Sequence, residues 1–310
     1  MDKFKQLETF VAVATKGGLS AAAKLENVAP AIIGRRIDAL EARLGIKLLI
    51  RTTRRVTLTQ EGQAFLENCE RILQDLDTAE NAVALGSVQA GGQIKLSAPG
   101  GFGRQHVAPL LPTFTHRHPA VQLHLDLSDR YVDLINESID LAIRIGQLPD
   151  SNLISVKLAD NPRVIVASPS YLSQHGTPQT PQDLTQHRCL TLGQESAQHR
   201  GWLLKSSPHD PRQLGYIKVR GDLACNDGSA LLDWAIKGYG LAWRSMWEVR
   251  GALSRGQLVT VLNEYAAPPV GIYAVFPDKR LLPLRVRLLI DFFKQTYGDT
   301  EYWLTGKVTQ

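Results

Sequence analysis

Apolar residues repeat at helical spacing in the first part of the chain. Ile33, Ile37, Leu40 and Leu44 follow one another at spacings of 4, 3 and 4, which predicts one apolar face of a helix. Pro30 suits the first turn of this helix, because its missing N–H group costs nothing there.

A shorter helix is predicted just before it. Ser20 is a hydroxyl residue suited to accept the orphan amide groups of a helix start, and residues 21–24 are strong helix formers. Residues 26–28 fit a tight corner. The pattern therefore predicts two short helices across a turn.

The second helix also has a small outward face. At about 100° per residue, Ala31, Gly34, Arg35 and Asp38 point away from its apolar side. A narrow face of small residues with one arginine is suited to approach base edges in a DNA major groove.

Two β-like runs follow, over residues 47–50 and 56–58. Arg51, Arg54 and Arg55 lie between or beside them, where arginines of a hairpin tip contact phosphates or enter a minor groove. By periodicity alone, a structural helix pair with a solvated basic loop also fits.

A long helix is predicted from Gln60 to Ser87, about 42 Å at 1.5 Å per residue, with Thr59 as its N-cap. Its apolar residues form a heptad seam that needs a partner, either its own domain or a second copy of the chain. Gly86, Gly91 and Gly92 would then form a flexible joint. The seam comprises Phe65, Cys69, Ile72, Leu76, Ala79 and Val83.

From Gln93 onward, predicted strands alternate with helices, which is typical of α/β layers around a mainly parallel sheet. The predicted strands are residues 94–97, 121–127, 141–145, 164–167, 222–225, 240–243 and 271–276. The predicted helices are residues 103–116, 132–137, 228–237 and 284–297.

The excess positive charge of the chain is concentrated in its first 60 residues. Residues 1–60 hold 11 Lys and Arg against 5 Asp and Glu, whereas the whole chain carries a net charge of only +5. Localised positive charge indicates a polyanion partner. A membrane surface fits less well, because no long basic amphipathic helix with aromatic anchors is present.

Residues 21–62 resemble the winged helix-turn-helix of the LysR-type transcriptional regulators. The resemblance continues over essentially the whole chain through the segments SAPGGFG, RIGQLPDS and GYGLAWRS. It implies a dimerising linker helix and a C-terminal α/β domain of two lobes like those of periplasmic solute-binding proteins. Where many members carry glutamine or serine on the recognition helix, this chain has Pro30 and Gly34, and Arg35 retains the arginine.

A candidate effector site follows from the sheet pattern. Ligands of open α/β sheets bind where a strand turns into a helix, as at residues 97–103, whose glycines let amides approach an anion. An ordinary turn fits equally well. Arg144 and Arg244 end strands and offer planar forks to a carboxylate, or serve as structural ion-pair partners. Asp227 is a candidate N-cap. The resemblance places these loops, with Ser128 and Asp129, in the cleft between the lobes.

Enzyme signatures are missing. No P-loop, complete G-x-G-x-x-G element or G-x-S-x-G elbow is present. The three cysteines are far apart and no histidine cluster with acidic residues suggests a metal, so we predict no cofactor. No secretory signal or membrane-length apolar run is visible, so we expect a cytoplasmic protein.

We therefore predict a transcriptional regulator that binds double-stranded DNA, senses a small organic anion and forms homo-oligomers, with RNA polymerase as a further candidate partner and no membrane. The alternative is a small-molecule-binding protein or enzyme with an unrelated basic helical domain. The predicted domains are a winged helix-turn-helix at 1–59, a linker at 60–92 and an effector domain at 93–310. Its lobe one spans 93–167 and 269–310, and lobe two spans 168–268.

The predicted sites are as follows. The DNA-binding residues are Ser20, Pro30, Ala31, Gly34, Arg35, Arg36, Arg51, Thr53, Arg54 and Arg55. The effector-binding residues are Ser97, Pro99, Gly100, Phe102, Ser128, Asp129, Arg144, Asn226, Asp227, Trp243 and Arg244. The six residues of the heptad seam are assigned to dimerisation.

Overall fold

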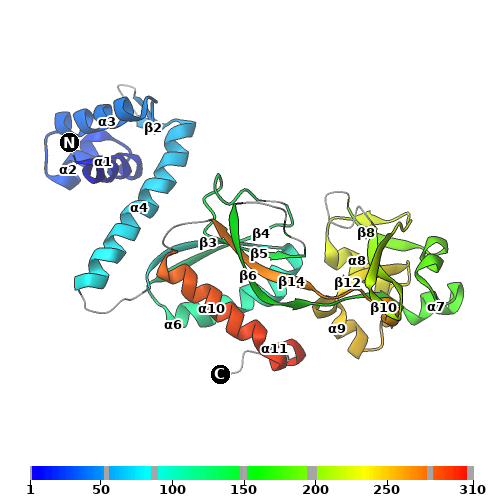
Figure 1. The fold of residues 1–310 in the computed structure, drawn as a ribbon. Coiled ribbons are helices and arrows are strands. Elements are labelled where there is room, and N and C mark those ends of the chain that lie inside the picture. Colours follow the sequence, from blue (N-terminus) through cyan, green and yellow to red (C-terminus); the bar gives the residue numbers. More distant parts are fainter. Residues whose placement is uncertain are drawn as a thin grey trace. The chain divides into compact units, whose positions relative to one another are not determined.

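The computed structural model describes residues 2–51, 56–84, 90–130, 132–146, 148, 152–193, 201–277 and 282–305. The chain divides into two compact units. Unit 1 holds residues 1–93 with 118–122, and unit 2 holds residues 94–117 and 123–310. Figure 1 follows the elements of both units along the chain.

Unit 1 packs its helices around a single apolar core. Phe10, Ile33, Ile37 and Leu40 are completely buried in it, as the helical spacing in the second helix predicted. The strands β1 and β2 pair antiparallel. The elements are α1 (Lys3–Lys16), α2 (Leu19–Glu26), α3 (Pro30–Leu44), β1 (Leu49–Arg51), β2 (Val56–Leu58) and α4 (Gln60–Ala84).

The helix ends in unit 1 agree only partly with the sequence predictions. Pro30 is the first residue of α3, as predicted. Thr59 caps α4, because its Oγ1 accepts the amide of Gly62 at 2.9 Å. The predicted cap at Ser20 is wrong. Helix α2 begins one residue earlier, after Gly18, without a side-chain cap, and Ser20 is exposed inside its first turn.

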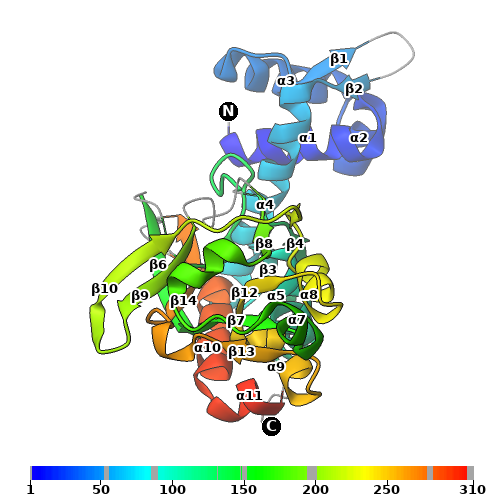
Figure 2. The same cartoon turned by 90° about the vertical axis from the view of Figure 1, so that its right-hand side faces the viewer.

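Unit 2 contains two five-stranded sheets, each of which defines a lobe. In lobe one the strand order is β4-β3-β5-β14-β6. Its elements are β3 (Gly92–Ala98), α5 (Gly100–Phe102), a π-helical turn (Gly103–Val107), a 3-10 turn (Ala108–Leu110), α6 (Leu111–Arg117), β4 (Val121–Leu127), β5 (Leu141–Ile145), β6 (Leu153–Asn161), β14 (Val270–Pro277), α10 (Leu284–Gly298) and α11 (Thr300–Thr305). Helix α10 packs along β6, and Figure 2 shows it beside the sheet.

Lobe two has the strand order β11-β8-β12-β7-β13, with a separate β9–β10 hairpin. Its elements are β7 (Arg163–Ala167), α7 (Pro169–His175), a 3-10 turn (Pro181–Gln186), β8 (Cys189–Leu192), β9 (Trp202–Ser207), β10 (Asp210–Ile217), β11 (Ala224–Cys225), α8 (Gly228–Ile236), β12 (Leu241–Ser245), α9 (Met246–Ser254), β13 (Val259–Val261) and a 3-10 turn (Asn263–Tyr265).

The structure of unit 2 corrects three sequence predictions. Its sheets are mixed and not mainly parallel, because β14 runs antiparallel to β5 and β6, and β7 runs antiparallel to β12 and β13. The chain crosses to lobe two at Pro162, not near Ser168, since Arg163–Ala167 already lies in the second sheet. Residues 132–137 form no helix, because the Asp133 carboxylate instead caps a tight turn through the amides of Ile135 and Asn136.

No helix in the described part of the chain is long and apolar enough to span a membrane. The described residues also contain no group of three His, Cys, Asp or Glu side chains arranged to hold a metal ion.

Candidate DNA-binding surface and effector site

The outward face of α3 is small and carries a single basic residue. Arg35 and Ala31 are exposed, and Gly34 is partly exposed between them. A Cβ atom added at Gly34 would meet no atom within 4 Å, so packing within the described residues does not require glycine there. Without a side chain at this position, another molecule can approach the helix backbone closely.

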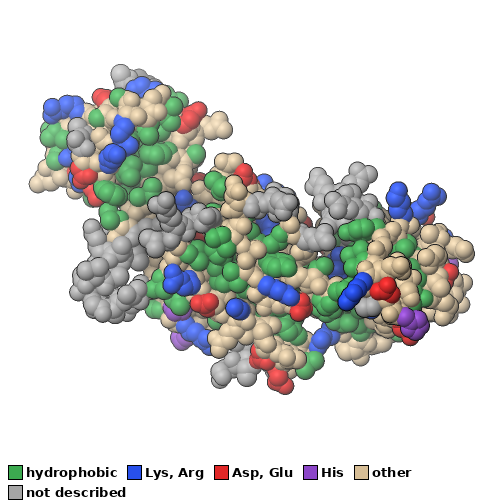
Figure 3. Space-filling model, in the orientation of Figure 1, with side chains coloured by type: hydrophobic (Ala, Val, Ile, Leu, Met, Phe, Trp, Pro, Cys, Tyr) green, Lys and Arg blue, Asp and Glu red, His purple; other side chains and the backbone are tan. Residues whose placement is uncertain are grey.

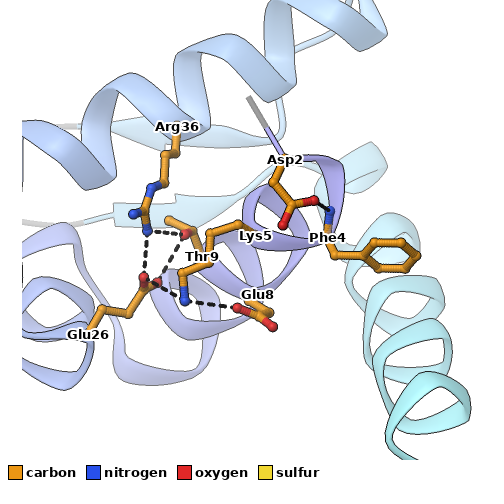
Figure 4. A network of polar contacts seen from close by, with 7 residues as sticks. All are labelled: Asp2, Phe4, Lys5, Glu8, Thr9, Glu26 and Arg36. Carbon is orange, nitrogen blue, oxygen red and sulfur yellow. Dashed lines mark hydrogen bonds and ion pairs between the residues drawn. The ribbon is translucent and has the colours of Figure 1, made fainter. Parts of the chain in front are cut away.

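Arg36 was predicted to bind DNA, but its guanidinium is bonded to other residues of unit 1 instead. Its Nη1 donates to Glu26 Oε2 at 2.5 Å and to Thr9 Oγ1 at 3.2 Å, and Lys5 Nζ lies 3.2 Å from the same carboxylate. Figure 4 shows these side chains converging between the first three helices. Burial alone would raise the pKa of Glu26, but the hydrogen bonds from Thr9, Lys5 and Arg36 more than offset it and the pKa is lowered.

This network holds α3 against α1 and α2. Its charge-assisted hydrogen bonds are stronger than neutral ones, and the Arg36 guanidinium is occupied by them. We therefore remove Arg36 from the candidate base contacts. Lys and Arg side chains are visible on the surface of unit 1 in Figure 3.

Arg51 stands at the end of β1 beside α3. Its Nη2 lies 2.9 Å from Asp38 Oδ1, and its side chain keeps about a third of its surface exposed. The other predicted hairpin residues, Thr53, Arg54 and Arg55, lie outside the described residues.

The first half of the predicted dimer seam faces inward, which corrects that prediction. Cys69 is completely buried in the core of unit 1, where burial raises its pKa to about 12. Phe65 packs its ring 5.5 Å from that of Phe10. Farther along α4, Ile72 is 42% exposed and Leu76 is partly exposed. The side chains of the last two seam residues, Ala79 and Val83, lie outside the described ones.

In lobe one, the turn after β3 brings several predicted residues together. The amide of Gly100 donates to Asp129 Oδ1 at 3.0 Å, so an aspartate of this chain already occupies the helix start where an anion was expected. Ser97 is completely buried. Ser128 accepts the amide of Arg130 at 3.3 Å. The half-buried Arg144 donates to the carbonyl of Ile143 at 3.2 Å.

Phe102 and Pro99 have supporting roles. Pro99 precedes the helical stretch as its N-cap residue. Phe102 is buried in an aromatic cluster that joins both lobes, with ring distances of 5.1 Å to His106 and 5.3 Å to Trp247 of α9. Nδ1 of His106 lies 2.9 Å from the hydroxyl of Tyr302 in α11, and burial lowers the His106 pKa to about 4.

In lobe two, the second predicted arginine is an ion-pair partner. Arg244 is 7% exposed and makes two hydrogen bonds to the Glu248 carboxylate, at 2.7 and 2.8 Å. The edge of the guanidinium that could bind a ligand carboxylate is therefore occupied by Glu248. This favours the role of Arg244 as a structural ion-pair partner over a role in effector binding. Asp227 is an N-cap as predicted, because its Oδ1 accepts the amides of Ser229 and Ala230. Asn226 is exposed before it.

Sequence reasoning missed Arg163. Its guanidinium lies 3.8 Å from the centre of the Trp243 ring, and its Nη2 donates to the Trp243 carbonyl at 3.3 Å. Burial, with the nearby Arg244 charge, lowers the Arg163 pKa to about 9. No local sequence signal marks it, because β7 and β12 pair across 80 residues of chain.

Several buried polar atoms have no hydrogen-bonding partner among the described residues. They lie at strand ends and in the aromatic clusters, and most of them are donors. They are Ser97 Oγ, Asn161 Oδ1, Arg163 Nε, Trp202 Nε1 and Trp247 Nε1. A separate hollow of about 370 Å³ is lined by Lys157, Tyr273 and their neighbours, and by none of the predicted effector residues.

The chain matches two family models. A model described as LysR substrate binding domain matches residues 87–298. A model described as bacterial regulatory helix-turn-helix protein, lysR family, matches residues 4–63.

Relatives and solved structures match over nearly the full length. The chain is 38% identical to the HTH-type transcriptional regulator DmlR of Escherichia coli (strain K12), over 94% of each chain. It is 34% identical to the HTH-type transcriptional activator TtdR of the same strain, over 93% of this chain and 91% of that protein. The structure of CrgA, from Neisseria meningitidis, superposes with a TM-score of 0.60 at 30% identity, covering 95% of this chain and 99% of that one. The full-length Vibrio cholerae virulence activator AphB gives a TM-score of 0.58 at 29% identity, covering 96% and 100%.

Proposed function

Because this chain belongs to the LysR family of transcriptional regulators, we propose that it reads an operator with α3 and the β1–β2 hairpin as a dimer, and that its effector is a small organic anion. The chain combines a helix-turn-helix domain with an effector-binding domain. LysR regulators bind DNA and small-molecule effectors and form oligomers.

The exposed face of α3 is the observation that carries the DNA-binding part. Arg35 projects from a face kept small by Ala31 and Gly34, whereas the opposite face is buried. An arginine so placed suits bidentate contacts with a guanine edge. The paired strands β1 and β2 and the chain between them, which we together call the wing (residues 49–58), supply Arg51, Arg54 and Arg55 as candidates for phosphate or minor-groove contacts.

Replacing Arg35 tests this assignment. R35A should lose roughly 1–3 kcal/mol of operator binding and keep its melting temperature, because the side chain is exposed and no ion pair is shown for it among the described residues. K16A, which removes an exposed basic residue at the end of α1, is the matched control and should lose less. Equal losses in both variants would show that Arg35 contributes only net charge.

We place the dimer contact on the exposed part of α4. Ile72 and Leu76 follow the turns that face the unit's own core, and an apolar side chain exposed at this spacing suits a second helix. We assign residues 1–59 to DNA binding, 60–92 to the linker and 93–310 to effector sensing. The first turns of α4 thus serve the DNA-binding core as well as the linker.

The effector part rests on the buried polar atoms that lack partners. Ser97, Arg163 and two tryptophans offer donors, and a buried donor without an acceptor costs free energy. We propose that a ligand rich in acceptor oxygens, such as a carboxylate, accepts a hydrogen bond from one or more of them. Asp129 at the α5 start adds an acceptor, which suits a hydroxyl or ammonium group on the same molecule.

A panel of small carboxylic acids and the corresponding amides tests this class. An acid at 100 times its dissociation constant should stabilise the folded chain by about 2.7 kcal/mol, measured as a shift in thermal unfolding. The matched amide should give a smaller shift. Stabilisation by the amides alone would overturn the anionic assignment.

A further inference from the structure

A buried carboxylate links the recognition helix to the wing. Glu41 lies on α3 and is 3% exposed. Its Oε1 accepts the amides of Leu48 at 2.9 Å and Leu49 at 3.1 Å. Its Oε2 accepts Lys47 Nζ at 2.7 Å and lies 3.9 Å from Nη2 of Arg51. One side chain of α3 thus holds the backbone where β1 begins.

The start of the long helix α4 contacts the same segment. Thr59, which caps α4, donates its hydroxyl to the Lys47 carbonyl at 2.9 Å. Gly62 lets α4 approach, because a Cβ there would lie 2.1 Å from the Leu48 carbonyl oxygen. The start of β1 therefore has defined contacts with both α3 and α4, and the carboxylate supplies the charged ones.

The state of the Glu41 carboxyl agrees with this geometry. Burial alone would raise its pKa, but the hydrogen bonds from Lys47 and from the two amides more than offset burial and lower the pKa. The carboxylate is therefore held in its ionised form, which makes stronger hydrogen bonds than a neutral acceptor.

We propose that Glu41 is a positioning residue for the wing. It fixes the start of β1 relative to α3, so that α3 and the wing can contact the same DNA duplex at the same time. The proposal rests on the proposed DNA-binding role of the wing. Glu41 itself contacts no DNA, since its carboxylate is buried. It acts through the backbone of Leu48 and Leu49, so its loss should weaken contacts made several residues away.

Glu26 offers a matched comparison within the same unit. Its carboxylate is also largely buried and paired with basic groups. Its partners Thr9, Lys5 and Arg36 lie on α1 and α3, and none lies on the wing. Removing either charge should weaken the fold, but only the loss of Glu41 should act through the wing.

A double-mutant cycle separates these roles. The full chain is titrated with a duplex enriched from a random library by the wild-type chain, and with a random duplex, over a range of salt concentrations. E41Q should weaken binding to the enriched duplex about tenfold and reduce the slope of log affinity against log salt by about one to two units, as expected for lost phosphate contacts. In an R54A/R55A background, E41Q should cost clearly less, about threefold, since two of the three wing arginines that it positions are already gone.

Two further variants test whether the loss of DNA affinity in E41Q passes through the wing. E26Q should weaken binding by the same factor in both backgrounds, because its effect does not pass through the wing. E41D keeps the charge but shortens the side chain, so it should resemble E41Q in affinity and in salt slope. E41D also provides the test if E41Q does not fold. Melting temperatures of all variants show which losses come from unfolding.

The outcomes are distinct. Equal costs of E41Q in both backgrounds, with R54A/R55A itself weakened, would overturn the positioning role and leave the wing as a DNA contact. An E41D variant with wild-type affinity and slope would also overturn it. An R54A/R55A variant that binds like the wild type would overturn the wing's part in the proposed function, and the role of Glu41 with it.

Discussion

Removing the imidazole of His106 should flatten the acid sensitivity of the effector domain. This side chain is half-buried between Phe102, Trp247 and the C-terminal helix α11. H106N keeps an amide near the position of Nδ1, which faces the Tyr302 hydroxyl at 2.9 Å, but it removes the group that titrates. The expected change is therefore in the pH dependence of stability, beyond any constant cost of the smaller side chain.

The magnitude follows from the pKa. Burial lowers the His106 pKa to about 4 from an ordinary value of 6.5. Between these values the unfolded chain binds a proton that the folded chain does not, so stability is lost as pH falls through this window. At about 1.4 kcal/mol per pKa unit, the loss should be roughly 2 kcal/mol at pH 5 and roughly 3 kcal/mol below pH 4.

Tryptophan fluorescence during urea unfolding of the full chain measures this loss. All five tryptophans lie between residues 202 and 303, so the signal reports on unit 2. The wild-type free energy of unfolding should fall between pH 7.5 and pH 5 by about 2 kcal/mol more than that of H106N. His187, whose pKa is also lowered by burial, is present in both chains and cancels. Equal pH dependence in the two chains would refute the buried, neutral state of His106.

Three further outcomes are expected. L76E should give a smaller species in light scattering, because it buries like charges across the proposed dimer, whereas Q63E on the exposed side of α4 should keep the wild-type mass; a wild-type mass for L76E would place the dimer contact elsewhere. R244A should cost roughly 3–5 kcal/mol in urea unfolding, because Glu248 is left buried without its partner, and a cost below about 1 kcal/mol would show that the pair is not buried in solution. S97A should raise stability slightly, because it removes a buried hydroxyl that has no hydrogen-bonding partner among the described residues, and it should shift the dose response of promoter output to effector; an unshifted response would remove Ser97 from the site.

Local periodicity was sufficient for the recognition helix but not for the linker. The spacing of Ile33, Ile37 and Leu40 depends only on which side of one helix is buried, and the structure confirms it. The seam of α4 has the same kind of spacing whether it faces its own domain or a second chain. Contact with Phe10, 55 residues earlier, decides that Phe65 faces inward, and no local pattern carries this information.

The effector site shows the same limit. The turn after β3 and the cap at Asp227 follow from local chemistry and were predictable. The Arg244–Glu248 pair lies at an i, i+4 spacing and was available as a sequence signal, although Arg244 was also consistent with a ligand contact. Arg163 meets Trp243 only because β7 and β12 pair. Lobe two is inserted between β6 and β14, and β14 then pairs antiparallel with both β5 and β6, which makes the lobe-one sheet mixed.

Selection of bound fragments from a random DNA library by the full chain, with wild type and R35A in parallel, tests the DNA-reading role most directly. The wild-type chain should enrich a partly palindromic sequence, bound at least about a thousandfold more tightly than random DNA. R35A should lose the base preference at one position in each half-site while keeping the remaining motif. Absence of any enriched sequence with the wild-type chain, or the same complete motif with R35A, would contradict sequence reading by α3.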